Sequence, residues 1–130
     1  MITLEEIRTI HSRIIEIDRT NQDDYIPGER YIAIIESMLE YKMGDDKSVF
    51  YNAAVALHTI ASRHPYYNGN KRTACTTALM ILKNEGINLT VNKEDRIQFI
   101  IDIATPEKGI TVEIIEKWLI NNSKIDENND

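Results

Sequence analysis

Apolar residues recur at helical spacing along most of this chain. The first stripe follows a capping-box pattern, in which Thr3 precedes Glu6 by three residues. The stripe itself comprises Leu4, Ile7, Ile10, His11, Ile14 and Ile15. Steps of three and four residues place these side chains on one face, so the pattern predicts an amphipathic helix that buries this face.

Further stripes of this kind are separated by turn signals. Pro27 before Gly28 indicates a loop over 22–28, and Gly86 is a natural end for a helix. Residues 87–91 alternate between apolar and polar and predict a short extended piece. The further helices are expected over 30–41, 48–63, 70–84, 94–104 and 111–121. About six helices joined by short loops predict an all-α domain, folded as a compact helical bundle.

The length and composition indicate one domain. Of the 130 residues, we assign 1–121 to this domain and 122–130 to a polar tail that is expected to fray. No stretch approaches the roughly 20 apolar residues that cross a bilayer. The N-terminus is acidic where a secretory signal is basic, so we expect a cytoplasmic protein without a membrane partner. Cys75 is the single cysteine and is expected to be a small buried side chain.

The charge distribution has one local exception. The net charge of −6 argues against nucleic acid as a partner, because such binding relies on many cations that contact phosphates. Residues 64–72 nevertheless combine His64, a Gly-containing turn, and the adjacent cations Lys71 and Arg72. A small positive region on an acidic protein suits a small anionic ligand better than a long polyanion.

The turn over 64–72 has the parts of an anion site. The helix expected to begin near Asn70 points its unpaired N–H groups and positive dipole end at the preceding turn. Gly69 allows close approach of the backbone, and Asn70 can cap the helix or donate an amide N–H to a phosphate. Lys71 and Arg72 add charge at the same place. His64 follows the preceding stripe, so we expect it on the core-facing side, as a candidate general base.

Each feature alone also has an ordinary structural interpretation. A single histidine beside a loop is structural more often than catalytic, and Asn-Gly-Asn is a common turn. Two cations at a helix start oppose the dipole by about 0.3–1 kcal/mol per charge. Such a misfit favours a functional reason. His11 is expected to pack on the first helix and His58 to lie at the surface, since no histidine spacing indicates a transition-metal site.

The run from His64 to Ala74, HPYYNGNKRTA, resembles the signature of the Fic/Doc superfamily. The Fic branch has the form HPFx(D/E)GNGRxxR, and the Doc (death-on-curing) branch has the form HxFx(D/N)(A/G)NKR. Tyr66 replaces the usual Phe. The positions that match the Doc form are His64, Asn68, Gly69, Asn70, Lys71 and Arg72. Weaker similarity in 2–11, 27–28 and 82–86 extends the resemblance over residues 1 to about 121.

The resemblance implies a group-transfer activity. Fic proteins transfer AMP from ATP to a protein hydroxyl, whereas Doc transfers the γ-phosphate to elongation factor Tu and blocks translation. Lys71 stands where Fic has Gly, and Cys75 stands where Fic has its second Arg. Both positions favour the Doc branch. The chain is therefore expected to be a kinase-like toxin that uses ATP and Mg²⁺.

The resemblance also implies a role for each motif residue. His64 would take the proton from a Ser or Thr hydroxyl of the target. Lys71 and Arg72 would stabilise the transferring phosphoryl group, and together with Gly69 and Asn70 would bind the nucleotide. Asn68 stands where Fic has an acidic Mg²⁺ ligand, and its neutral amide predicts weaker metal binding.

A separate antitoxin is the partner that the resemblance implies. The inhibitory motif (S/T)xxxE(G/N) of many Fic proteins is absent, since Ile81 occupies the hydroxyl position before Glu85-Gly86. The antitoxin is expected to fold a disordered segment into a groove that Tyr66, Tyr67 and apolar side chains of the first two helices would line.

Two alternatives to the Doc-like toxin stay open at this point. One is a Fic-type AMP transferase, from which Lys71 distinguishes the Doc form. The other is a non-catalytic binding module with a vestigial pocket, which the departures at Tyr66, Asn68 and Cys75 keep in view.

Overall fold

The computed structural model describes residues 1–19 and 28–126. These residues form six α-helices, and the predicted all-α class is confirmed. The helices are α1 (Leu4–Arg19), α2 (Ile32–Ser37), α3 (Val49–Arg63), α4 (Asn70–Lys83), α5 (Lys93–Ile103) and α6 (Val112–Asn121). A π-helical turn, η1 (Met38–Lys42), continues α2, and a 3₁₀ turn, η2 (Pro106–Lys108), follows α5. The loop predicted over 22–28 lies outside the described residues except for Gly28.

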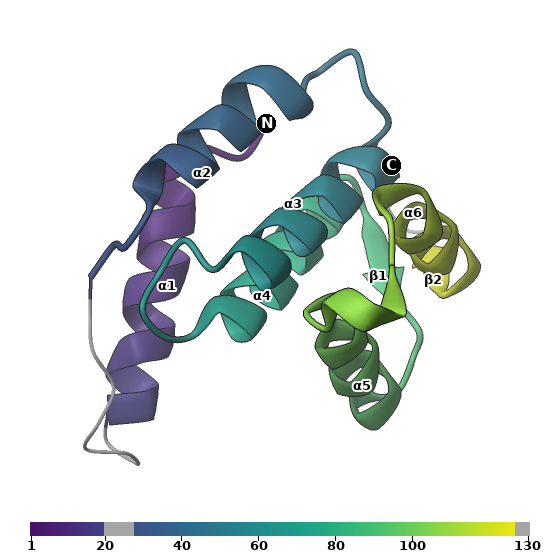
Figure 1. Ribbon diagram of the computed structural model, residues 1–130. Coiled ribbons are helices and arrows are strands. Elements are labelled where there is room, and N and C mark those ends of the chain that lie inside the picture. The colour runs from purple at the N-terminus through teal and green to yellow at the C-terminus, as the bar shows by residue number, and fades with distance from the viewer. Residues whose placement is uncertain (20–27, 127–130) are drawn as a thin grey trace.

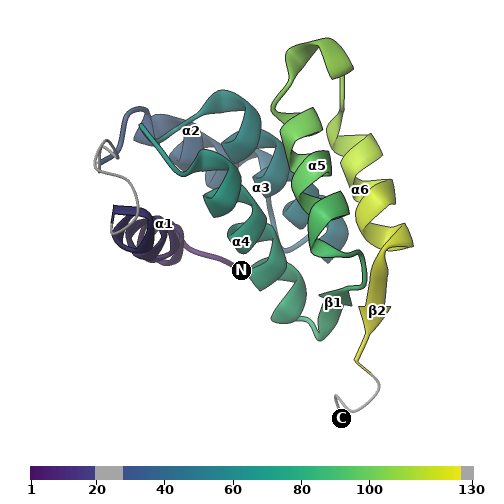
Figure 2. The same cartoon turned by 90° about the horizontal axis from the view of Figure 1, so that it is seen from below.

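The hairpin of α3 and α4 forms the centre of the fold. Figures 1 and 2 show α1 and α2 on one side of this hairpin and α5 and α6 on the other. α3 is buried along most of its length, and four of its buried residues are alanines that let neighbouring helices approach closely: Ala53, Ala54, Ala56 and Ala61. The loop that joins α3 to α4 therefore lies at the end of the core, beside α1.

Side-chain caps mark the starts of several helices, and the predicted capping box forms at the start of α1. The Thr3 N–H donates to Glu6 Oε1 at 3.1 Å, and the Glu6 N–H donates to Thr3 Oγ1 at 3.2 Å, which completes the capping box. Ser48 and Thr111 cap α3 and α6 by accepting the N–H groups of residues 51 and 114. None of the helices within 1–19 and 28–126 is long and apolar enough to cross a membrane.

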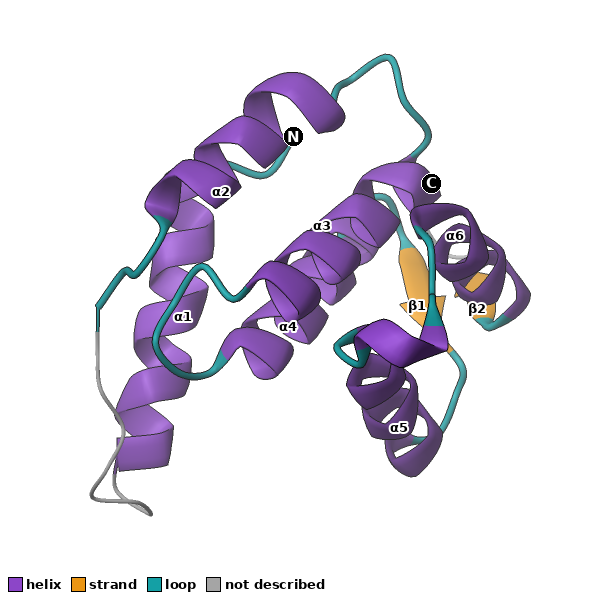
Figure 3. Cartoon of the chain, in the orientation of Figure 1, coloured by secondary structure: helices purple, strands orange, loops and turns teal. Residues whose placement is uncertain are grey.

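Two short strands pair near the C-terminus (Figure 3). β1 (Ile87–Leu89) runs antiparallel to β2 (Ser123–Ile125), with Ile87 opposite Ile125. The predicted extended piece is thus confirmed. The expectation that the tail frays is wrong over β2, because its backbone pairs with the edge that β1 offers. The proposed domain boundary after residue 121 remains a prediction.

Candidate functional site

The loop after α3 turns outward at His64. This residue is the C-cap of α3 and adopts φ 52° and ψ 62°, a left-handed conformation that non-glycine residues rarely take. Its side chain is exposed. The expectation that His64 lies on the core-facing side is wrong, because α3 ends at Arg63 and the left-handed turn redirects the chain. The exposed imidazole is open to a hydroxyl on another protein.

The carbonyl of Pro65 fixes the loop to the segment before α2. It accepts the N–H of Arg30 at 2.9 Å and the N–H of Tyr31 at 2.8 Å. An isolated β-bridge joins Glu29 to Tyr66 at the same place. These contacts help to hold the left-handed residue His64, whose conformation costs about 1–2 kcal/mol.

Asn70 closes the loop from within. Its Oδ1 accepts the Tyr66 N–H at 3.0 Å, and its Nδ2 donates to the Tyr66 carbonyl at 2.9 Å. Asn70 is only 8% exposed. The predicted capping role of its side chain is wrong, since Gly69 is the N-cap of α4 and no side chain caps this end. The amide instead satisfies the buried backbone of Tyr66.

His11 fixes the same loop from α1. Its Nε2 lies 2.9 Å from the Asn68 carbonyl oxygen, and its ring stacks on Tyr66 with centroids 3.6 Å apart. His11 and Tyr66 are both buried, which confirms that His11 packs within the fold. Burial lowers the pKa of His11, so the neutral ring is favoured. His58 is half-buried, whereas the sequence indicated a surface residue.

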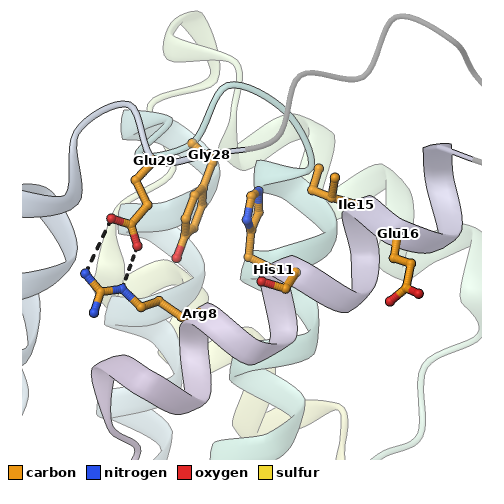
Figure 4. A pocket seen from close by; sticks show the side chains of 8 residues that line it. Arg8, His11, Ile15, Glu16, Gly28 and Glu29 are labelled. Carbon is orange, nitrogen blue, oxygen red and sulfur yellow. Dashed lines mark hydrogen bonds and ion pairs between the residues drawn. The ribbon is translucent and has the colours of Figure 1, made fainter.

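A cavity of about 560 Å³ opens beside this anchor, between α1 and the segment at Glu29 (Figure 4). At its rim Arg8 Nε donates to Glu29 Oε1 at 2.5 Å, and Arg8 Nη1 donates to Glu5 Oε1 at 2.7 Å. The Tyr66 hydroxyl has no hydrogen-bond partner among the described residues. Burial, followed by the charge of Glu29, raises the pKa of Tyr66 to about 12. Tyr66 lines this cavity although it is only 1% exposed, whereas Tyr67 is 52% exposed. A partner groove at these two residues remains a prediction.

Two features of position 69 favour glycine: its left-handed backbone conformation and the close approach of Ile14 on α1. It adopts φ 75°, and a Cβ there would come within 3.3 Å of Ile14 Cγ2 on α1. Because glycine lacks a Cβ, α1 and the loop can pack closely. Gly69 therefore has a packing role in addition to the predicted role beside a ligand. The Gly69 carbonyl accepts the Thr73 N–H at 2.9 Å, the first bond of α4. The N–H groups of Asn70 and Lys71 have no acceptor within the helix, so this end carries partial positive charge.

Lys71 and Arg72 are exposed at the start of α4 and line a second cavity. The second cavity lies between α4 and α5 and has a volume of about 560 Å³. Lys93 and Arg96 of α5 also line it. Cys75 lies in its wall and is half-buried. Burial raises the pKa of the Cys75 thiol, and the charge of Arg96 opposes this shift. The protonated thiol agrees with a packing role for Cys75.

The motif loop therefore presents its predicted residues on two sides. His64 projects from the end of α3, and Lys71 and Arg72 project from the start of α4 toward the second cavity. The sequence did not indicate Arg8 with Glu29, or Lys93 with Arg96. Arg8 and Glu29 are paired only by the tertiary fold, and the cations of α5 follow the motif by more than 20 residues.

A comparison with family models decides the assignment. The Fic/DOC family model matches residues 1–82, which include α1, α3, the motif loop and most of α4. This chain belongs to the Fic/Doc family. A comparison with curated proteins found no match. Members of the family are typically nucleotidyl- or phosphotransferases that use ATP and a divalent metal.

The described residues offer little to a metal ion. No group of three or more His, Cys, Asp or Glu side chains gathers anywhere in 1–19 or 28–126. At Asn68 the backbone carbonyl lies 2.9 Å from His11 Nε2, and the role of the side-chain oxygen as a metal ligand remains a prediction. Such a donor set fits a Mg²⁺ ion held mainly by phosphate and water oxygens.

Proposed function

We propose that this chain is a Doc-like phosphotransferase, which moves the γ-phosphate of ATP to a Ser or Thr hydroxyl of a target protein. The observation that carries the proposal is the start of α4. Its unpaired N–H groups and two exposed cations follow directly after a loop that projects His64. The Lys at position 71, where the Fic branch has Gly, supports phosphate transfer over AMP transfer.

In the proposed reaction, the histidine, the two cations and the backbone N–H groups have separate roles. His64 accepts the proton of the target hydroxyl through a ring nitrogen, and the hydroxyl oxygen forms a bond to the γ-phosphorus. The bond from that phosphorus to the bridging oxygen breaks, and ADP leaves with the electron pair. Lys71, Arg72 and the N–H groups of Gly69–Lys71 stabilise the charge on the transferring group, which is the main catalytic term in phosphoryl transfer.

The metal and the partners follow from the same proposal. Asn68 offers one side-chain oxygen to Mg²⁺, which when bound neutralises charge on the phosphates of ATP. The target would be elongation factor Tu, so that translation in the cytoplasm stops. A cognate antitoxin would restrain this activity. Two exposed side chains at the loop, Tyr67 and Tyr31, would contribute to its docking surface.

Intact-mass measurement tests the proposal. Elongation factor Tu is incubated with this protein, ATP and Mg²⁺, and the expected result is a gain of one phosphate. His64→Ala should abolish the gain, whereas His58→Ala, a half-buried histidine of α3 outside the loop, should retain it. A gain of one AMP would instead assign the Fic-type reaction. No gain on this target, together with no ATP binding, would refute the transferase.

A further inference from the structure

The groove between α4 and α5 extends the candidate site beyond the motif. Figures 1 and 2 show these two helices side by side, and the cavity between them measures about 560 Å³. This volume lies within the range of roughly 300–1,000 Å³ that small-molecule sites occupy. One wall carries Lys71 and Arg72 of α4, and the other carries Lys93 and Arg96 of α5.

The charges of α5 are sorted by face. Lys93, Arg96 and Ile97 line the groove, whereas the acidic residues Glu94 and Asp95 between them do not. None of the described residues that line the groove is acidic, although the whole chain has a net charge of −6. The groove is therefore a positively charged channel on a negatively charged protein, which attracts small anions.

Three of the cations of the groove, Lys71, Lys93 and Arg96, form no ion pair with a carboxylate of the described residues. The ion pairs formed within 1–19 and 28–126 join Arg8 to Glu5 and Glu29, and neither includes Lys71, Lys93 or Arg96. Lys71 and Lys93 each stand in the first turn of a helix, where the dipole disfavours positive charge. An anion bound in the groove would offset both the mutual repulsion and the unfavourable dipoles.

Apolar side chains continue the groove beyond its cations. Ile97 and Ile101 lie in the wall on α5 and are 46% and 40% exposed, and Leu79 faces them from α4. A ligand that suits this surface has an anionic part and a flat or apolar part. A nucleoside polyphosphate combines both.

We propose that Arg96, assisted by Lys93, binds the phosphate chain of ATP in this groove, with the nucleoside against Ile97 and Ile101. The inference rests on the nucleotide site proposed at Lys71 and Arg72. It adds to that site a second helix, which lies outside the residues matched to the family. Arg suits this role because its planar guanidinium forms paired hydrogen bonds to phosphate oxygens.

The single cysteine reports on occupancy of the groove. Cys75 lies in the wall next to Arg96, so a thiol reagent reacts with the full-length protein at this position alone. With Mg²⁺ present, ATP should slow this reaction in the wild type. Arg96→Gln should need about tenfold more ATP for equal protection, which corresponds to about 1.4 kcal/mol. Arg13→Gln, an exposed arginine of α1 away from the groove, should behave as the wild type.

The circular dichroism of each variant checks that the fold is intact. Protection is expressed relative to each variant's own labelling rate without ATP, because the charge of Arg96 itself acts on the Cys75 thiol. Arg96→Lys, which keeps the charge but loses the planar fork, should lie between the wild type and Arg96→Gln. If Arg96→Gln and the wild type need the same ATP concentration, the inference is overturned, even where His64-dependent transfer is observed. If Arg96 governs protection but no phosphate reaches any target, the inference stands and the proposed reaction alone fails. Absence of protection by ATP in the wild type overturns the inference.

Discussion

Replacing Asn70 by Ala tests whether this side chain braces the loop or binds phosphate. In the structure its amide forms two hydrogen bonds with the backbone of Tyr66, which is 1% exposed. The substitution leaves a buried N–H and a buried C=O without partners. Each unpaired group costs about 1–3 kcal/mol, so for the two groups the free energy of unfolding should fall by about 2–6 kcal/mol.

Urea denaturation followed by circular dichroism measures this loss. The matched control is Asn84→Ala, which removes an exposed amide at the C-cap of the same helix and should change stability by less than about 0.5 kcal/mol. For a domain of this size, each kcal/mol shifts Tm by about 3–5 °C, so thermal unfolding provides a second reading.

An Asn70→Ala variant of unchanged stability would contradict the bracing role. If Asn70→Ala is as stable as Asn84→Ala but binds ATP much more weakly, the amide serves the ligand and the bracing role is refuted. If Asn70→Ala is destabilised as expected, weaker ATP binding near its Tm reports loss of loop geometry. ATP titrations are therefore compared well below the Tm of the variant.

Two further predictions concern the anchoring of the same loop. Gly69→Ala should destabilise the protein more than Gly109→Ala in denaturation experiments. Both residues have positive φ, which costs alanine about 1–2 kcal/mol, but only at Gly69 does the new Cβ crowd Ile14. Equal losses of stability in the two variants would show that α1 can shift to accommodate the new Cβ without a free-energy cost. Stability should also fall as pH drops below about 6.5, because burial lowers the pKa of His11 and its charged form favours the unfolded chain. His11→Gln should flatten this dependence between pH 7 and 5, with a remaining slope from His58, whose pKa burial also lowers. An unchanged slope in His11→Gln would contradict the assignment to His11.

The chain alone determined the helices and the place of the motif loop. Stripes of apolar residues at helical spacing, together with the capping box at Thr3, were sufficient to predict α1, α3 and α6, since both signals act within a few residues. The motif loop could also be located from the sequence, because its residues Gly69, Asn70, Lys71 and Arg72 are consecutive.

The tertiary structure decided what surrounds that loop. The outward turn of His64 depends on backbone torsions, and the bond from His11 to the Asn68 carbonyl joins residues 57 positions apart. The pairing of β1 with β2 likewise joins distant segments, so local periodicity carried no sign of it. Arg96 is the clearest case. In sequence it is one cation in a charged helix, and only the packing of α5 against α4 brings it to the groove that holds Lys71.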